Sequence, residues 1–146
     1  MNDIIENCNV TRGRTRIIKK YNISNKSIHT GVDITADTVY NYISGVVLYV
    51  GQTNKCYTVA VQYNYNICFT YSNLKDVYVR PGELVPSGVE IGKCDKFVHF
   101  ECAKSDSSNK QFPVRYGTQT YYKVDSTDYL YNGKLLQDPN STYEVN

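Results

Sequence analysis

The stretch that decides the fold is Ile28-His29-Thr30-Gly31-Val32-Asp33-Ile34, in which a histidine and a carboxylate lie four residues apart in a strand-like run. The chain has only two histidines. The second, His99, lies in residues 97–101 (FVHFE), which also alternate like a strand. Two imidazoles and one carboxylate form a three-ligand set for zinc that leaves a fourth position open. His29, Asp33 and His99 are therefore candidate metal ligands, and two histidines that are only hydrogen-bonded are the alternative at this point.

The composition indicates one globular β domain. The chain has 146 residues, long enough for one hydrophobic core, and 15 of them are tyrosine, a residue that favours strands. The net charge of +2 does not indicate binding to nucleic acid or to an acidic membrane surface. No apolar run approaches the ~20 residues of a membrane-spanning helix, and the N-terminal residues lack the apolar core of a signal peptide.

The five cysteines do not form the pattern of a disulfide scaffold. Their number is odd and their spacing is irregular, so free thiols in a chain folded in the cytosol are expected. A separate metal cluster of Cys94, His99 and Cys102 is an alternative. The spacing matches no common zinc knuckle, and a buried cysteine more often packs as a small hydrophobic residue.

Short β-rich segments separated by turns predict an all-β fold. Strands are expected over residues 14–21, 39–50, 56–63, 67–71, 89–92 and 97–103, with one or two more over 112–124. Helical turns are expected only at 3–7, 72–76 and 125–131. This pattern favours an antiparallel β sandwich or open barrel over residues 14–131. Residues 1–13 are expected to be an N-terminal arm and 132–146 a C-terminal tail, both extending from the β domain and becoming ordered against other subunits.

The order of motifs resembles the lysostaphin/LytM-type zinc endopeptidases, which cut peptide bonds in bacterial peptidoglycan. Residues 29–34 (HTGVDI) resemble the HxxxD motif of that family. Residues 79–92 (VRPGELVPSGVEIG) are similar to its V-x-x-G-x-x-V-x-x-G-x-x-I-G segment, and 97–101 resemble H-x-H-F-E. Residues 124–130 (VDSTDYL) resemble the closing D-P-x-x-Y-L stretch, with serine replacing proline. The resemblance spans residues 12–130 and implies the lysostaphin-type fold, with His29, Asp33 and His99 as zinc ligands.

Two catalytic positions of that family are altered here. The histidine of its Y-x-H-L element corresponds to Asn73, and the first histidine of H-x-H corresponds to Phe97. Asparagine cannot exchange a proton near neutral pH, and phenylalanine can neither exchange one nor donate a hydrogen bond. Loss of one general acid or base typically costs about 10²–10⁴ in rate. Glu101, on the same strand face as His99, is either a substitute base or a structural partner of an imidazole.

These features predict a catalytically impaired domain with a structural or cell-wall-binding role. The alternative is an active zinc-dependent peptidoglycan endopeptidase, and His29 and His99 could also be hydrogen-bonded without a metal. A wall-related protein that folds in the cytosol without an export signal suggests a phage tail tip or baseplate, with virion subunits and peptidoglycan peptides as partners. A cytosolic regulatory protein is the alternative location and role.

Overall fold

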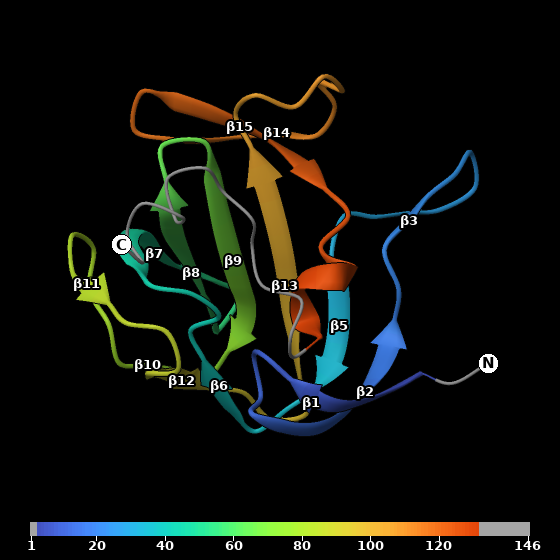
Figure 1. Ribbon diagram of the computed structural model, residues 1–146, viewed down its shortest axis with the longest axis vertical. Helices are drawn as coiled ribbons and strands as arrows, with labels where there is room; N and C mark the ends of the chain where they lie inside the picture. The colour runs from blue at the N-terminus through green and yellow to red at the C-terminus, as the bar shows by residue number, and fades with distance from the viewer. Residues whose placement is uncertain (1–2, 132–146) are drawn as a thin grey trace, which may run out of the picture.

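A computed structural model describes residues 3–131 of the chain. Its main feature is an open antiparallel sheet of ten strands, eight of them in the order β1-β2-β5-β13-β9-β8-β7-β11 (Figure 1). These strands are β1 (Ile4–Cys8), β2 (Gly13–Lys19), β5 (Val32–Thr35), β7 (Gly45–Thr53), β8 (Cys56–Asn64), β9 (Ile67–Leu74), β11 (Leu84–Val85) and β13 (Phe97–Lys104). The prediction of an all-β, antiparallel fold is confirmed, and the sheets are open.

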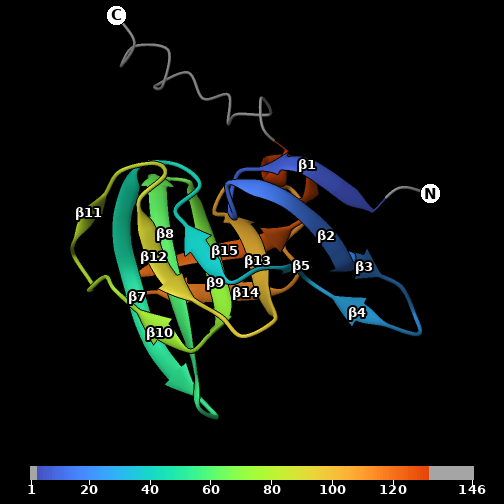
Figure 2. The ribbon, with the colours of Figure 1, turned by 90° about the horizontal axis from the view of Figure 1, so that it is seen from below.

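The other strands extend or flank this sheet. β14 (Pro113–Tyr116) pairs with β15 (Gln119–Val124), and β15 joins the end of β13. A second sheet contains β10 (Asp76–Val77), β12 (Glu90–Lys93) and β6 (Thr38–Tyr40), and β3 (Asn22–Ile23) pairs with β4 (Ile28–His29) as a small hairpin (Figure 2). The only helical element in residues 3–131 is the 3-10 turn η1 (Thr127–Leu130), as predicted for that region.

The main core lies on one face of the ten-stranded sheet. Phe69 and Phe100, on neighbouring strands, stack with ring centroids 5.7 Å apart, and Tyr42 packs edge-on against Phe69 at 5.0 Å. Buried Tyr71 donates its hydroxyl proton to Asn41 Oδ1 and accepts a hydrogen bond from the Tyr42 amide. Because buried polar groups need partners, this network fixes residues 41–42 against the sheet.

The opposite face of the sheet is only partly covered. Residues 97, 99, 101 and 103 of β13 alternate with core residues and therefore point to this face. There the β14–β15 hairpin packs Tyr121 against Cys68 and Ala103, forming a smaller core. Beyond the hairpin, toward the start of β13, the same face carries polar side chains, including both histidines. The uncovered part of this face is where the predicted site lies.

The structure corrects the expectation for the N-terminal segment. Residues 3–13 are not an arm and contain no helix, since β1 pairs with β2 and the side chains of Ile5, Cys8 and Val10 are buried. Asn9 also donates hydrogen bonds to the carbonyls of Tyr129 and Tyr131, which join both ends of the described chain. The predicted C-terminal tail, 132–146, lies outside the described residues.

Two further expectations are wrong. Residues 72–76 are not a helical turn, because β9 continues to Leu74 and β10 begins at Asp76. The predicted strand 39–50 is two strands in different sheets, β6 and β7, separated at residues 41–44. The Asn41 amide donates to the carbonyls of Ile43 and Val85, which stabilises this break in the strand.

Candidate metal centre

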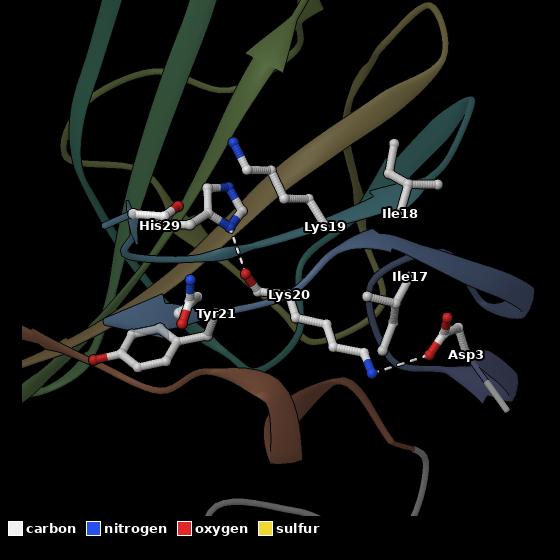
Figure 3. A pocket seen from close by; sticks show the side chains of 9 residues that line it. Asp3, Ile17, Ile18, Lys19, Lys20, Tyr21 and His29 are labelled. Carbon is white, nitrogen blue, oxygen red and sulfur yellow. Dashed lines mark hydrogen bonds and ion pairs between the residues drawn. The ribbon is translucent and has the colours of Figure 1, made fainter. Parts of the chain in front are cut away.

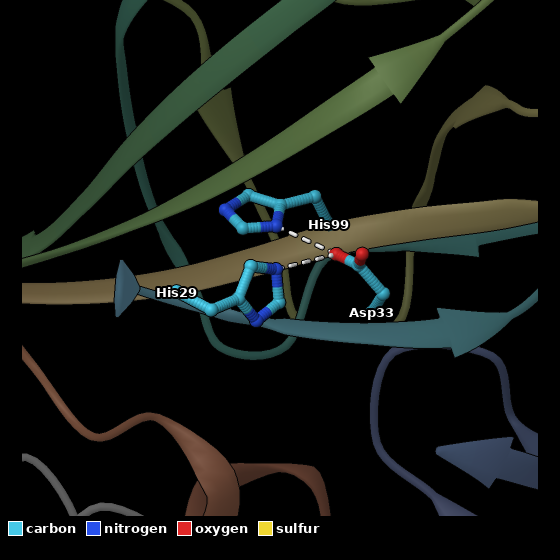
Figure 4. A group of neighbouring side chains, drawn as sticks. All are labelled: His29, Asp33 and His99. Atoms are coloured by element: carbon cyan, nitrogen blue, oxygen red, sulfur yellow. Dashed lines mark hydrogen bonds and ion pairs between the residues drawn. The ribbon is translucent and has the colours of Figure 1, made fainter. Parts of the chain in front are cut away.

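Three strands bring the predicted ligands together. His29 ends the short strand β4, Asp33 lies on β5, and His99 is the direct cross-strand partner of Asp33 on β13 (Figure 4). One ligand atom of each residue lies within 4.8 Å of those of the other two, and the two imidazole centroids are 5.0 Å apart. Strand pairing therefore places side by side two residues that are 66 positions apart in the sequence.

Hydrogen bonds to the outer ring nitrogens turn both imidazoles toward the same point. His29 Nδ1 lies 2.8 Å from the carbonyl oxygen of Lys20, which can only accept, so this nitrogen carries a proton. In the neutral ring, Nε2 then carries no proton and can accept a bond, and it lies 3.3 Å from Asp33 Oδ1. Two acceptors facing each other at this distance favour a cation between them. His99 Nδ1 approaches the same oxygen at 2.6 Å.

The donor set fits a tetrahedral divalent ion. Zinc–nitrogen and zinc–oxygen bonds of about 2.0–2.2 Å place neighbouring ligand atoms about 3.3–3.6 Å apart. The 3.3 Å separation of His29 Nε2 and Asp33 Oδ1 matches this spacing, and His99 needs only a small adjustment from 2.6 Å. Two imidazole nitrogens and a carboxylate leave a fourth position for water or another ligand.

Glu101 completes the surroundings of His99. Its Oε2 lies 2.7 Å from His99 Nε2 and accepts a hydrogen bond from Thr30 at 2.9 Å, while Oε1 pairs with Lys123 at 3.3 Å. The carboxylate is thus held from three sides, two of them outside its own strand. This arrangement leaves His99 Nδ1 to face Asp33, which is how carboxylates commonly orient metal-binding histidines.

The same contacts shift the protonation of His99. Burial alone lowers its pKa, but hydrogen bonds to Asp33 and Glu101, with the charges of both carboxylates, raise the pKa to about 9. Burial raises the pKa of Glu101, but His99, Lys123 and Thr30 outweigh burial and hold this pKa below its usual range. Without a metal, the ring is therefore an imidazolium between two carboxylates.

Gly31 gives the site its close packing. A β-carbon at this position would lie 2.7 Å from His99 Cε1, from Nε2 and from the carbonyl oxygen of Phe100. Real β-carbons essentially never approach other atoms so closely. The glycine between His29 and Asp33 therefore allows the first two predicted ligands to lie against the third.

The two altered positions lie next to this group but contribute no proton-transfer group. Asn73 has a left-handed backbone (φ 68°), and its amide donates to the Phe97 carbonyl at 2.9 Å. Its Oδ1 accepts a contact from the Cys56 thiol at 3.5 Å. Phe97 is half-buried at the start of β13. Asn73 is therefore used in holding β9 to β13.

The alternative cluster of Cys94, His99 and Cys102 does not form. Cys94 and Cys102 belong to the main core, and burial raises their pKa values to about 11 and about 12. The Cys94 thiol contacts the carbonyl of Ala36 at 3.3 Å. All five cysteines are free.

Three contributors to the site were absent from the prediction. The Lys20 carbonyl is a backbone atom, and no side-chain pattern reports it. Lys123 lies on the Tyr-rich strand β15. It is one of many lysines in the chain, and nothing in its neighbouring sequence marks it as part of a site. Thr30 lies inside the HxxxD stretch itself. Its position one residue after His29 was the only sequence signal that could have placed its hydroxyl group at the site.

Residues 27–110, more than half of the chain, match the family described as Peptidase family M23. Together with the fold and the converging ligand set, this match shows that the chain belongs to family M23.

Solved structures confirm the fold. The SpoIIQ–SpoIIIAH pore forming complex contains a chain with 18% identity and a TM-score of 0.63, covering 99% of this chain and 97% of that one. The antimicrobial peptidase lysostaphin from Staphylococcus simulans has 20% identity, covers 86% and 55%, and has a TM-score of 0.58. The catalytic domain of EnpA, a prophage-encoded M23 protein from Enterococcus faecalis, has 17% identity, covers 86% and 91%, and has a TM-score of 0.56.

Coverage of the relatives is uneven. The chain spans 33% of the length of a zinc-containing peptidase from Vibrio cholerae, whereas it spans nearly all of the SpoIIQ–SpoIIIAH chain. No curated protein matches the chain significantly. Among the described residues, no helix has the length and apolar character needed to cross a membrane.

Proposed function

We propose that this M23 domain binds Zn²⁺ through His29, Asp33 and His99 and recognises peptides of the peptidoglycan type, with little or no hydrolysis. The observation that carries the proposal is the combination of a converging ligand set with Asn73 and Phe97 at the two flanking positions. A bound zinc would polarise a peptide carbonyl and acidify a coordinated water.

Turnover needs more than the metal. One group must accept the water proton and another must hold the charge that develops on the carbonyl oxygen. The Asn73 amide already donates to the Phe97 carbonyl, and Phe97 has no polar atom in its side chain. Glu101 is fully engaged by His99, Thr30 and Lys123, so it serves as a support for His99 instead of a mobile base.

The active peptidase is the alternative function, and the presence of a buried carboxylate beside His99 favours it. Glu101 is the titratable group nearest the ligands outside the set itself. If the domain hydrolyses peptidoglycan, Glu101 is the first residue to examine as the base.

We also propose that the domain works in contact with other proteins, as a subunit of a phage tail tip or baseplate. Two observations support this. A relative of similar fold is part of a pore forming protein complex, and another is prophage-encoded. Mass spectrometry of purified virions induced from the source organism is the direct test. Absence of this protein from intact particles contradicts the virion assignment.

Elemental analysis and hydrolysis assays test the main proposal together. Wild-type protein should contain about one zinc per chain and release peptidoglycan or pentaglycine fragments at background rate. The double variant Asn73→His with Phe97→His should raise hydrolysis more than either single change, because both groups act on one transition state. Thermal unfolding is measured first, since Asn73→His also removes the hydrogen bond to Phe97. Robust wild-type turnover that His99→Ala abolishes contradicts the assignment of an impaired enzyme.

A further inference from the structure

A hollow of about 480 Å³ adjoins the metal group on the side of His29 (Figure 3). Its walls are the end of β2, the following residues to Asn22, and the β3–β4 hairpin, and His29 is shared with the ligand set. A ligand in this hollow would therefore lie next to the metal position. None of the functions argued above uses its other side chains.

A register shift in β2 directs Lys19 to this side of the sheet. Ile17 pairs with Ile34, and Lys19 pairs with Asp33, so two steps along β2 oppose one step along β5. Without the shift, Ile17 and Lys19 would share a face. Ile17 and Ile34 are both buried in the main core, so Lys19 leaves the strand on the same face as Asp33. Bulges commonly re-aim side chains beside functional sites.

The two lysines of the hollow differ in what they contact. Lys20 pairs with Asp3 at 3.2 Å, which partly neutralises its charge. Lys19 is exposed, and within residues 3–131 its ammonium group has no ion pair or hydrogen bond. It therefore supplies one positive charge beside the metal group, while Asp33 faces the two histidines.

The remaining wall is mixed, with the polar residues Asp3, Asn22 and Ser27 beside apolar side chains. Ile18 is 49% exposed and Tyr21 is half-buried, and both line the hollow. A lysine ammonium acts as a compact point charge and suits a singly charged anion. One unpaired lysine beside Ile18 and Tyr21 matches a carboxylate on a small aliphatic peptide, whose backbone could also bond to the polar part of the wall.

From these contacts we propose that the hollow is a carboxylate subsite, in which Lys19 binds a peptide carboxylate next to the metal position. The inference rests on the proposed peptide recognition and specifies its substrate class. The carboxylate comes either from the C terminus of a peptide or from an acidic side chain. Both sources share the same chemistry at Lys19.

Titration of full-length protein with three dipeptides, followed by NMR chemical shifts, tests the subsite. The probes are acetyl-Ala-Ala with a free carboxylate, its C-terminal amide, and acetyl-Ala-Glu amide. Wild-type protein should bind at least one acidic probe about tenfold more tightly than the neutral amide, and the preferred probe identifies the source of the carboxylate. Lys19→Gln should remove this preference. Lys55→Gln, at an exposed lysine in the turn between β7 and β8 and outside the hollow, should leave it unchanged.

Three outcomes overturn the subsite: no probe binds, the acid and the amide bind equally, or Lys19→Gln retains the preference. Zinc content measured on the same samples separates this inference from the proposed function. A protein without zinc that keeps the Lys19-dependent preference contradicts the metal role alone. A zinc-loaded protein without the preference contradicts the subsite alone.

Discussion

Asp33 Oδ1 is the atom on which the site converges, and the residues around it decide how it is used. His99 Nδ1 lies 2.6 Å from it, and Glu101 engages the other ring nitrogen. His29 faces it because the Lys20 carbonyl holds Nδ1. The outer partners thus determine which nitrogen lone pairs are presented, and changes to them should alter metal binding without touching a ligand.

Glu101 is expected to act as a positioning residue for His99. Glu101→Ala should weaken zinc binding by about 10–100-fold, the usual cost of losing such a partner. Glu101→Gln keeps an acceptor for His99 Nε2 and should restore part of the affinity. Competition with a chromogenic chelator measures both variants. Equal affinities for wild type and Glu101→Ala contradict this role.

Stability of the chelated protein should depend on pH through His99. The pKa is raised from 6.5 to about 9 in the folded state. The protonated ring therefore stabilises the fold fully below pH 6.5, and this contribution, roughly 3 kcal/mol, is lost as pH rises through 9. Urea unfolding with EDTA at pH 6, 7.5 and 9 measures the trend. His99→Gln should flatten the profile in this window, and a wild-type profile that rises toward pH 9 contradicts the assignment.

Gly31→Ala should abolish metal binding by steric displacement. The added methyl group would overlap the His99 ring and the Phe100 carbonyl, which are both 2.7 Å away. The expected result is loss of zinc and a cost of about 1–3 kcal/mol in unfolding free energy from overpacking. Gly13→Ala is the matched control, because no heavy atom lies within 4 Å of its added carbon. Full zinc occupancy in Gly31→Ala would show that His99 is free to move.

At the scale of elements, β1 shows where strand prediction fails. Its sequence, IIENC, is short and half polar, and its strand conformation depends on pairing with β2 and on contacts made by Asn9. Such stabilisation is tertiary and leaves no local periodicity. The hairpin of β8 and β9 is the opposite case, since alternating side chains and an Asn-rich turn made it predictable.

Ile5→Ala tests whether β1 belongs to the core. Ile5 is only 1% exposed, so its truncation should cost about 2–5 kcal/mol in unfolding free energy. Ile28→Ala is the matched control, because Ile28 is 60% exposed and surface changes usually stay within about 0.5 kcal/mol. Chemical denaturation compares the two. Equal unfolding free energies for Ile5→Ala and Ile28→Ala would indicate that residues 3–13 do not belong to the core.

At the scale of the whole molecule, motifs predicted the fold class and named three candidate ligands, and strand pairing places these three residues together. The division of residues 39–50 between two sheets was not predictable, because the break depends on the buried Asn41 amide and its distant acceptor on Val85. The register shift that re-aims Lys19 was equally hidden. It is a property of two paired strands, and neither strand carries it alone.

Thiol chemistry reports on the packing of the entire domain. All five cysteines are free, and Cys56 alone is half-buried while the other four are buried. A thiol reagent should therefore label one site quickly in the native protein and five after denaturation, since only accessible thiolates react. Cys56→Ser should remove the fast phase. Rapid native labelling of several thiols contradicts the described packing.

The order of strands also has a consequence for how the chain folds. β7, β8 and β9 form a local meander, so their contacts close short loops and can form early. The pairing of β5 with β13 joins Asp33 to a residue 66 positions later, and its loop-closure entropy makes it a late event. During synthesis, His29 and Asp33 cannot contact His99 until β13 has left the ribosome. The ligand set is therefore a product of the last folding steps, and a nascent chain ending before residue 97 has a meander but no site.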